Sequence, residues 1–153
     1  MERYIAYTDG SCNNRSKIRC GGWGCLVFRW QDTPPKIEEA ICTKSGGAIG
    51  VTNNIMEITA IIEAARSVPN GSKIYIKTDS QYCIAVLSRP FKPHPKNAEL
   101  IRSFGELIRE KALNIEFRWV RGHNGNIYNE ECDRLAVSEY RKLSNLYERR
   151  DNT

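Results

Sequence analysis

The chain has 153 residues, a length at which one domain is the usual organisation and one sizeable core can be buried. Its formal charge is +5, from 23 Lys and Arg against 18 Asp and Glu, and this modest basic excess favours a polyanionic partner without requiring one. No stretch approaches the roughly 20 apolar residues of a membrane-spanning helix, and residues 1–4 lack the plan of a signal peptide. We therefore expect a single domain over residues 1–153 that is intracellular, cytoplasmic, monomeric and without a membrane partner.

Cysteine usage gives little sign of disulfides or zinc. A domain of this length with an ordinary core does not need disulfide bonds for stability. The chain has no Cys-x-x-Cys pair and only two histidines, His94 and His123, so paired zinc ligands are lacking. We expect reduced thiols at all six cysteines, which are Cys12, Cys20, Cys25, Cys42, Cys83 and Cys132.

The first third of the chain predicts an antiparallel meander. Residues 3–9 are rich in aromatic and β-branched side chains and end in Asp-Gly, which indicates a strand followed by a turn. Residues 12–22 are polar, with paired asparagines and paired glycines, and predict a loop. We expect a second strand over residues 23–30, a turn at the Asp-Thr-Pro-Pro of residues 32–35, and a third strand over residues 36–44.

The pattern then changes to a helical period. Residues 45–51 contain three glycines and predict a loop, whereas residues 52–68 carry apolar side chains on one helical face, with Thr and Asn available as N-caps. Residues 72–79 alternate as a strand does and end in Thr-Asp. Residues 80–87 suit a short helix.

The last third predicts two more helices and one more strand. Residues 89–96 contain three prolines and cannot be helical throughout. We expect a helix over residues 97–112, a strand over residues 115–120, a loop over residues 122–127 and a helix over residues 129–149. The order β-β-β-α-β-α-α-β-α predicts an α/β fold, with a five-stranded mixed sheet flanked by helices and its antiparallel strands first in the chain.

Four carboxylates are candidates for one site at an end of this sheet. Asp9 and Asp79 each close a strand with Thr-Asp, and the carboxyl ends of neighbouring parallel strands lie at the same edge, where ligand sites form. Glu57 interrupts the apolar face of the helix over residues 52–68, and Asp133 lies on the terminal helix. Taken one at a time, these residues are better explained as turn openers or helix-surface charges. The hypothesis of a shared site depends on the four together.

Carboxylates grouped in this way point to a divalent cation. Clustered acidic groups repel one another, and Mg²⁺ or Mn²⁺ supplies the counter-charge while taking oxygen ligands. Two such ions can stabilise both the attacking and the leaving oxygen when a phosphodiester is displaced. The set therefore predicts metal-dependent phosphodiester hydrolysis.

Four ordered segments make the prediction more specific. They are residues 7–12 (YTDGSC), 52–57 (TNNIME), 78–82 (TDSQY) and 122–136 (GHNGNIYNEECDRLA). Together they resemble the type 1 ribonuclease H family, and the resemblance covers nearly the whole chain. It implies the ribonuclease H-like fold and an endonuclease that cuts the RNA strand of an RNA–DNA hybrid, leaving 5′-phosphate and 3′-hydroxyl ends.

The resemblance also implies catalytic roles. Asp9, Glu57, Asp79 and Asp133 match the family's metal-binding carboxylates, with Asp9 bridging two Mg²⁺ ions and Asp133 helping to hold the ion nearer the attacking water. His123 matches a loop histidine thought to aid proton transfer or product release, and a structural histidine on a turn is the alternative.

Substrate contacts follow from the same resemblance, because the 2′-hydroxyl is what distinguishes RNA from DNA. The residues implied to lie along the minor groove, beside the phosphates or near the RNA strand are Asn53, Asn54, Glu57, Gln81, Thr52, Asn97 and Ser80. Helix capping is the alternative role for Asn53 and Asn54.

Two regions depart from the family pattern. Many members have Gly-Asn-Pro-Gly after the first Asp-Gly-Ser, whereas residues 13–22 here read NNRSKIRCGG, so the asparagine that contacts RNA has no certain counterpart. Asn13 and Asn14 are the candidates, and we include Cys12 and Asn14 among the substrate-binding residues. The protrusion found in some members is reduced to residues 88–96, with low charge and no tryptophan, so we expect a smaller phosphate footprint.

Two other functions are alternatives at this point. Other nucleases and transposase-like integrases share such a fold and acidic cluster, but they lack the Asn-Asn-x-Met-Glu motif and the histidine loop. A non-catalytic hybrid-binding module would be expected to lose one or more carboxylates. All four are present, which favours an enzyme.

Overall fold

The computed structural model describes residues 1–121 and 126–148. The strands are β1 (Arg3–Cys12), β2 (Gly21–Arg29), β3 (Cys42–Ala48), β4 (Lys73–Thr78) and β5 (Asn114–Trp119). The helices are α1 (Asn53–Arg66), α2 (Gln81–Leu87), α3 (Ala98–Lys111) and α4 (Ile127–Tyr147), with a short 3₁₀ turn at Ile37–Glu39. The predicted order of elements is confirmed.

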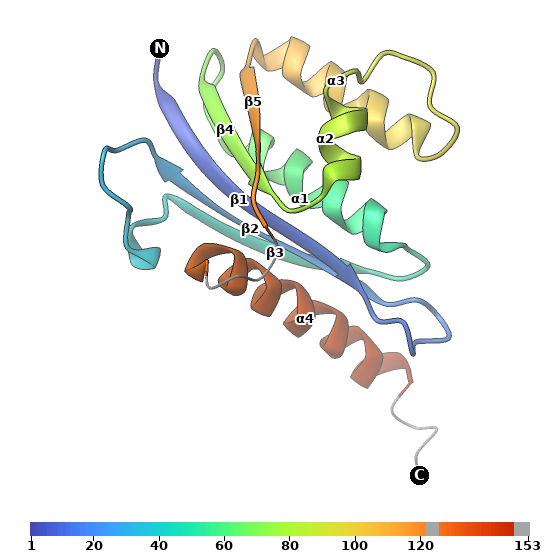
Figure 1. The fold of residues 1–153 in the computed structure, drawn as a ribbon. Coiled ribbons are helices and arrows are strands. Elements are labelled where there is room, and N and C mark those ends of the chain that lie inside the picture. Colours follow the sequence, from blue (N-terminus) through green and yellow to red (C-terminus); the bar gives the residue numbers. More distant parts are fainter. Residues whose placement is uncertain (122–125, 149–153) are drawn as a thin grey trace.

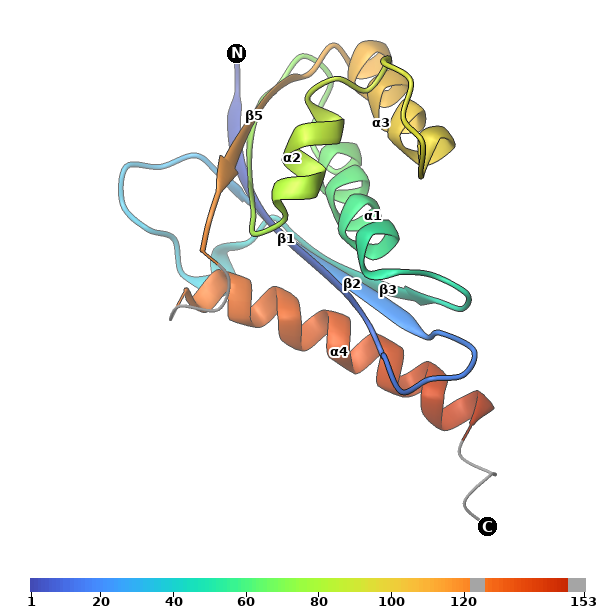
Figure 2. The same ribbon diagram turned by 45° about the vertical axis from the view of Figure 1, so that its right-hand side comes forward.

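The strands form one sheet in the order β3-β2-β1-β4-β5. β1 pairs with β2, and β2 with β3, in antiparallel fashion, whereas β4 lies parallel to both β1 and β5. The fold is therefore the predicted α/β arrangement with a mixed sheet. Helices α1, α2 and α3 cover one face, and α4 crosses the other face beneath β1, β2 and β3 (Figures 1 and 2).

Two hydrophobic clusters hold these layers together. The larger lies between the sheet and α1–α3, where Ile58 and Ile61 of α1 pack against Ile74 and Ile76 of β4 and against Phe104 of α3. Burying each such side chain contributes about 1.5–3 kcal/mol. The smaller cluster lies under the N-terminal half of α4 and stacks the rings of Tyr7 and Tyr128, with centroids 4.4 Å apart. These clusters fix the helices against the sheet edge where the carboxylates gather.

The third strand differs from its prediction. It covers Cys42–Ala48 rather than residues 36–44, and the 3₁₀ turn occupies Ile37–Glu39 because the Glu39 carboxylate accepts a hydrogen bond from the Lys36 N–H at 2.6 Å. The glycines of residues 45–51 indicated a loop, yet Gly46 and Gly47 belong to the strand. A Cβ on Gly46 would lie 2.8 Å from the Trp23 indole, and one on Gly47 would lie 2.8 Å from Leu143. Glycine here permits close packing rather than a turn.

The first strand is longer than predicted, and the Asp-Gly pair is not a turn. β1 continues through Asp9 and Gly10 to Cys12, with Asp9 opposite Gly24 and Gly10 opposite Trp23. The predicted loop of residues 12–22 is accordingly shorter. Within the residues that the structure describes, no helix combines the length and apolar character needed to cross a membrane. All six cysteines are free thiols.

Candidate active site

An open depression of about 320 Å³ lies at the carboxyl ends of β1 and β4. It contains all four predicted carboxylates and three of the predicted substrate residues. Its lining is Asp9, Gly10, Ser11, Asn53, Asn54, Glu57, Asp79, Ser80 and Asp133. Elements far apart in the sequence therefore meet at one place, as the strand order predicts.

Asp9 and Asp79 come together because their strands are parallel neighbours. Tyr7 of β1 is the register partner of Lys77 of β4, and each aspartate follows two residues later along its own strand. Asp9 is buried within β1, and Asp79 is half-buried directly after β4. Asp79 precedes Ser80, whose N–H donates to the Thr78 hydroxyl at 3.1 Å and turns the chain into α2.

Glu57 reaches the same point from α1 because Gly10 has no side chain. A Cβ on Gly10 would lie 2.3 Å from the Met56 carbonyl carbon and 2.4 Å from the Glu57 nitrogen, so α1 packs directly on the β1 backbone. The Gly10 N–H then donates to Glu57 Oε1 at 2.8 Å and to Asp9 Oδ1 at 3.0 Å. One carboxylate oxygen from each of Asp9, Glu57 and Asp79 lies within 4.8 Å of the other two.

Asp133 lines the depression from α4 but is outside this group of three. α4 lies close to the sheet because Gly24 of β2 has no Cβ, which would be 2.8 Å from the Cys132 carbonyl oxygen. The buried Cys132 thiol also contacts the Tyr7 carbonyl oxygen at 3.3 Å. Asp133 is half-buried and follows that contact directly.

Burial and mutual repulsion raise the pKa values of the two most buried carboxylates, Asp9 and Glu57. Burial is the main cause that raises the pKa of Asp9, and the nearby Asp79 and Asp133 carboxylates raise it further. The pKa of Glu57 is also raised, first by burial and then by the charge of Asp9. Burial and the neighbouring carboxylates therefore both disfavour the charged forms of Asp9 and Glu57.

The donor set suits a hard divalent cation. Three carboxylates offer oxygen ligands at short mutual distance, which is the chemistry that Mg²⁺ and Mn²⁺ prefer. Glu57 Oε2 is buried and has no hydrogen-bond partner among the described residues, so it is an acceptor available to an ion. The residues present therefore fit a metal centre.

Three predicted substrate residues line the rim beside the carboxylates. Asn53 and Asn54 are exposed in the first turn of α1, and Asn53 Oδ1 accepts the Cys12 N–H at 2.6 Å. Ser80 caps α2, because its hydroxyl accepts the Cys83 N–H at 3.1 Å. The capping role considered for Asn53 and Asn54 belongs to Thr52, whose hydroxyl accepts the Ile55 N–H at 3.2 Å.

A second hollow, of about 260 Å³, lies between the loop of residues 13–20 and the start of α1. Cys12, Asn14, Thr52 and Asn53 all line it. Asn14 is exposed, whereas the Cys12 thiol is half-buried and contacts the Val51 carbonyl oxygen at 3.4 Å. Asn53 lines both hollows, whereas Cys12, Asn14 and Thr52 are adjacent to the carboxylate depression rather than inside it.

Asn97 and Gln81 lie farther out. Asn97 lines a third hollow, of about 580 Å³, that also includes Ile55 and the N-terminus of α3. The Asn97 side chain donates to the Tyr82 hydroxyl at 3.0 Å, and its backbone is left-handed with φ 59°. Gln81 is exposed at the first position of α2. His123 lies outside the described residues.

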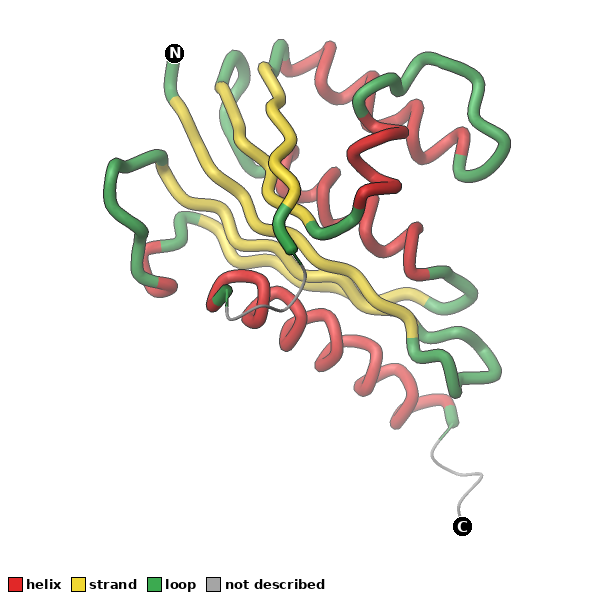
Figure 3. The backbone as a smooth tube through the Cα atoms, in the orientation of Figure 1, coloured by secondary structure: helices red, strands yellow, loops and turns green. Residues whose placement is uncertain are grey.

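Sequence reasoning missed the anchor of the loop of residues 13–20. The buried Ser16 hydroxyl donates to Glu148 Oε1 at 2.6 Å, and the Ile18 N–H donates to the same oxygen at 3.3 Å. Asn13 also donates to the Ser144 hydroxyl at 3.3 Å. The loop therefore lies against the C-terminal end of α4 (Figure 3), a pairing across more than a hundred residues that no local pattern signals.

The chain was compared with known proteins. The sequence model of the family described as RNase H matches residues 1–141. The ribonuclease H of Albidiferax ferrireducens is 33% identical over 89% of this chain and 93% of its own length. That of Chromobacterium violaceum is 34% identical over 88% of this chain and 92% of its own length.

Solved structures show the same fold. The crystal structure of LC9-RNase H1, a type 1 RNase H with the type 2 active-site motif, superposes with a TM-score of 0.71 at 24% identity, covering 94% of this chain and 81% of that one. The N-terminal RNase H domain of Rv2228c from Mycobacterium tuberculosis, solved as a fusion with maltose-binding protein, also gives 0.71, at 17% identity and with 94% and 97% coverage. The fold and the acidic site together define the class of protein as an α/β nuclease. The chain belongs to the RNase H family and is a ribonuclease H enzyme.

Proposed function

We propose that this enzyme hydrolyses the RNA strand of RNA–DNA hybrids by two-metal-ion catalysis with Mg²⁺, leaving 5′-phosphate and 3′-hydroxyl ends. The observation that carries the proposal is the group of Asp9, Glu57 and Asp79, whose carboxylate oxygens lie within 4.8 Å of one another beside Asp133. Bound Mg²⁺, or Mn²⁺ in its place, supplies Lewis-acid stabilisation of the charge that develops on the attacking and leaving oxygens.

The four carboxylates are the proposed ligands, and they differ in what the protein does with them. Asp9 and Glu57 are buried and share the Gly10 N–H, which fixes their orientation. Asp79 and Asp133 are half-buried, so they face the open side of the depression, where substrate arrives. The protein therefore contributes a rigid inner pair and a more accessible outer pair.

The polar residues at the start of α1 are proposed to contact the RNA strand. The Asn53 amide oxygen already accepts the Cys12 N–H, so its amide nitrogen is the group left to donate to a 2′-hydroxyl or base edge. Asn54, Ser80 and Gln81 extend this polar rim toward α2. Thr52 and Asn97, each at the start of a helix, are proposed to contact phosphates, because helix N-termini favour anions.

Three further roles are proposed, for His123 from the sequence and for Cys12 and Asn14 from their position. His123 is proposed to exchange a proton or assist product release, as an imidazole that titrates near neutral pH can do. Cys12 and Asn14 are proposed RNA contacts on the basis of their place beside Asn53. The cytoplasmic location and the monomeric state stay predictions.

A cleavage assay on four labelled substrates tests the proposal. With Mg²⁺ we expect cleavage of an RNA–DNA hybrid and no cleavage of single-stranded RNA, double-stranded RNA or double-stranded DNA, and chelation should abolish it. Asp9→Asn should lose activity by at least about a thousandfold, because it removes one inner ligand charge. The matched control is Asp32→Asn, a loop aspartate that is exposed and outside the site.

The outcome that contradicts the proposal is equally direct. Cleavage of double-stranded DNA in preference to hybrid would favour the integrase-like alternative, and undiminished hybrid cleavage by Asp9→Asn would remove the carboxylates from the mechanism. Product ends are read by a 5′-phosphate-dependent exonuclease, which should degrade the downstream RNA fragment. Resistance of that fragment would contradict the proposed bond cleavage.

A further inference from the structure

One face of the sheet is only partly covered by helix. α4 packs on β1, β2 and β3, whereas β4 and β5 make no comparable contact with it. Figures 1 and 2 show α4 running beneath β1, β2 and β3, with β5 at the opposite edge of the sheet and only its C-terminal end near the first turn of α4. The α4-side face of β4 and β5, together with the start of β1, is therefore open.

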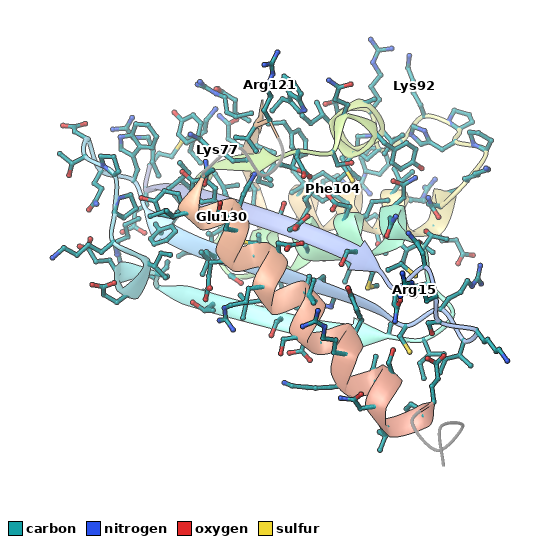
Figure 4. All side chains as sticks on the ribbon, turned by 60° about the horizontal axis from the view of Figure 1, so that its bottom comes forward. Arg15, Lys77, Lys92, Phe104, Arg121 and Glu130 are labelled. Atoms are coloured by element: carbon teal, nitrogen blue, oxygen red, sulfur yellow. The ribbon has the colours of Figure 1, made fainter. Side chains whose placement is uncertain are left out.

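The alternation of side chains along each strand decides which residues point to this open face. Ile74 and Ile76 of β4 enter the core beneath α1–α3, so Lys73, Tyr75 and Lys77 point to the opposite face. On β5, Phe117 packs into the same core, which places its neighbours Glu116 and Arg118 on the open face. Figure 4 labels Lys77, which emerges above the first turn of α4 in that view.

Aromatic rings and cations alternate across this face. The Trp30 and Tyr75 rings lie 5.0 Å apart, and the Arg3 guanidinium sits 5.2 Å from the Trp30 ring. Lys73 Nζ and the Arg118 guanidinium lie 5.1 Å and 5.5 Å from the Tyr75 ring. We call the set Arg3, Trp30, Lys73, Tyr75, Lys77 and Arg118 the cation–aromatic face.

The charge of this face is positive. Glu116, its one carboxylate on β4 and β5, pairs with Lys73 at 3.3 Å and with Arg118. Arg3 and Lys77 form no ion pair with any described residue. Four cations against one carboxylate leave a net charge of +3 next to two rings, of which Trp30 is 37% exposed and Tyr75 is half-buried.

The face is continuous with the candidate active site. Asp79 follows Lys77 by two residues, so in strand alternation it extends the row of Lys73, Tyr75 and Lys77 on β4 toward the depression, whereas Tyr7 on β1 is buried under Tyr128. From Asp79 back to Lys73 the strand rises about 20 Å, at roughly 3.3 Å per residue. That span matches about six stacked nucleotides at roughly 3.4 Å each.

From this arrangement we propose that the cation–aromatic face binds a single-stranded nucleic acid flank of the substrate as it leaves the active site. Unpaired bases can stack on aromatic rings while their phosphates meet Lys and Arg, and rings interleaved with cations are the surface such strands use. A protein partner is less well matched, because the face has little apolar area beyond the two rings. The inference rests on the proposed function, since it extends the path of the same substrate.

Binding to hybrids with and without a flank tests this inference. A blunt RNA–DNA hybrid is compared with hybrids that carry a six-thymidine tail at each of the four strand ends in turn. Full-length protein with Asp9→Asn is used throughout, so that the substrate stays intact. We expect a tail at one end to tighten Kd about five- to tenfold, because stacking and phosphate contacts add affinity.

Two variants should remove that gain. Arg3→Gln/Arg118→Gln deletes two exposed cations, and we expect the benefit of the tail to fall below about twofold and the log Kd–log salt slope to drop by about 1.4. Trp30→Leu removes the ring while keeping an apolar side chain, and it should also lower the benefit. Circular dichroism and melting temperature confirm that each variant is folded.

A matched control exists on the chain. Lys44 and Arg66 both pair with Glu63, as Lys73 and Arg118 pair with Glu116, but they lie near the C-terminal end of α1. Lys44→Gln/Arg66→Gln should keep the full benefit of the tail. The inference is overturned if no tail tightens binding beyond twofold, if the gain survives both face variants, or if the control variant loses it equally. Cleavage of the blunt hybrid by the unmodified enzyme is scored separately, so failure of the proposed function is distinguishable.

Discussion

The backbone N–H of Gly10 donates to the carboxylate of Glu57 at 2.8 Å, and this contact joins the C-terminal part of β1 to the first turns of α1. It exists because α1 packs on β1 without an intervening side chain. The approach places Glu57 beside Asp9, and it accounts for a glycine inside a strand where glycine otherwise weakens pairing.

Gly10→Ala should therefore damage both stability and activity. The new methyl group would meet backbone atoms at 2.3–2.4 Å, so α1 has to move away from β1. We expect a loss of about 2–3 kcal/mol in unfolding free energy, as for overpacked cores, and a fall in activity of at least about a hundredfold. Urea denaturation and the hybrid assay measure the two effects. Gly47→Ala is the control and should keep most activity, because its methyl group would meet the flexible Leu143 side chain at 2.8 Å and no backbone atom nearer than the Gly21 carbonyl oxygen at 3.1 Å. Normal activity in Gly10→Ala would show that Glu57 does not depend on this contact.

The pH dependence of stability should reveal the raised pKa of Asp9. Burial, assisted by Asp79 and Asp133, raises that pKa from 3.8 to about 7 in the metal-free protein. Between these values the folded state holds a proton that the unfolded chain has released, so stability falls as pH rises through this interval. Asp9→Asn removes the ionisation and should be more stable than the parent above pH 7 by up to about 4 kcal/mol, since the pKa rises by about 3 units and one unit corresponds to about 1.4 kcal/mol.

Denaturant titrations from pH 4 to pH 8 in a chelating buffer check this prediction. The advantage of Asp9→Asn should vanish near pH 4, where the carboxyl is protonated in the folded state. Asp32→Asn, at an exposed position, is the control and should show no such trend. An Asp9→Asn curve parallel to that of the parent would contradict the prediction.

Mg²⁺ should stabilise the folded protein, because the ion binds the clustered carboxylates only when the strands and α1 are assembled. At ten to a hundred times its Kd, the expected gain is about 1–3 kcal/mol by mass action. Asp9→Asn and Asp79→Asn should lose most of this gain. Differential scanning calorimetry at pH 8, with NaCl at matched ionic strength as the control, measures it. Equal stabilisation by NaCl would show only screening.

Glu148 should act as a positioning residue for the loop of residues 13–20. Its carboxylate holds Ser16 and Ile18, and that loop lines the hollow shared with Asn53. Glu148→Ala should raise KM for hybrid about three- to tenfold with little change in kcat, because loss of one or two hydrogen bonds costs roughly 1 kcal/mol each. Glu148→Gln keeps an acceptor oxygen and should restore most of the affinity. A change in kcat alone, or no rescue by Gln, would argue against positioning.

The sequence determined the order of elements and the mixed sheet, because these follow from periodicity and turn chemistry. It also singled out Asp9, Glu57, Asp79 and Asp133 as candidate ligands, because each lies in a recognisable segment. Local patterns misjudged Asp9-Gly10, which predicted a turn, and the glycines of β3, which predicted a loop. These residues belong to strands, and the missing side chains of Gly10 and Gly46 admit a helix and an indole ring.

Only the tertiary structure decided how close the functional groups lie. The approach of α1 over Gly10, the anchoring of the loop by Glu148 and the uncovered face of β4 and β5 each join segments distant in the chain. Sequence periodicity reports which face of an element is buried, but it carries no information on which distant backbone lies against that face. Packing of the whole domain sets those distances, and with them the geometry on which the proposed chemistry depends.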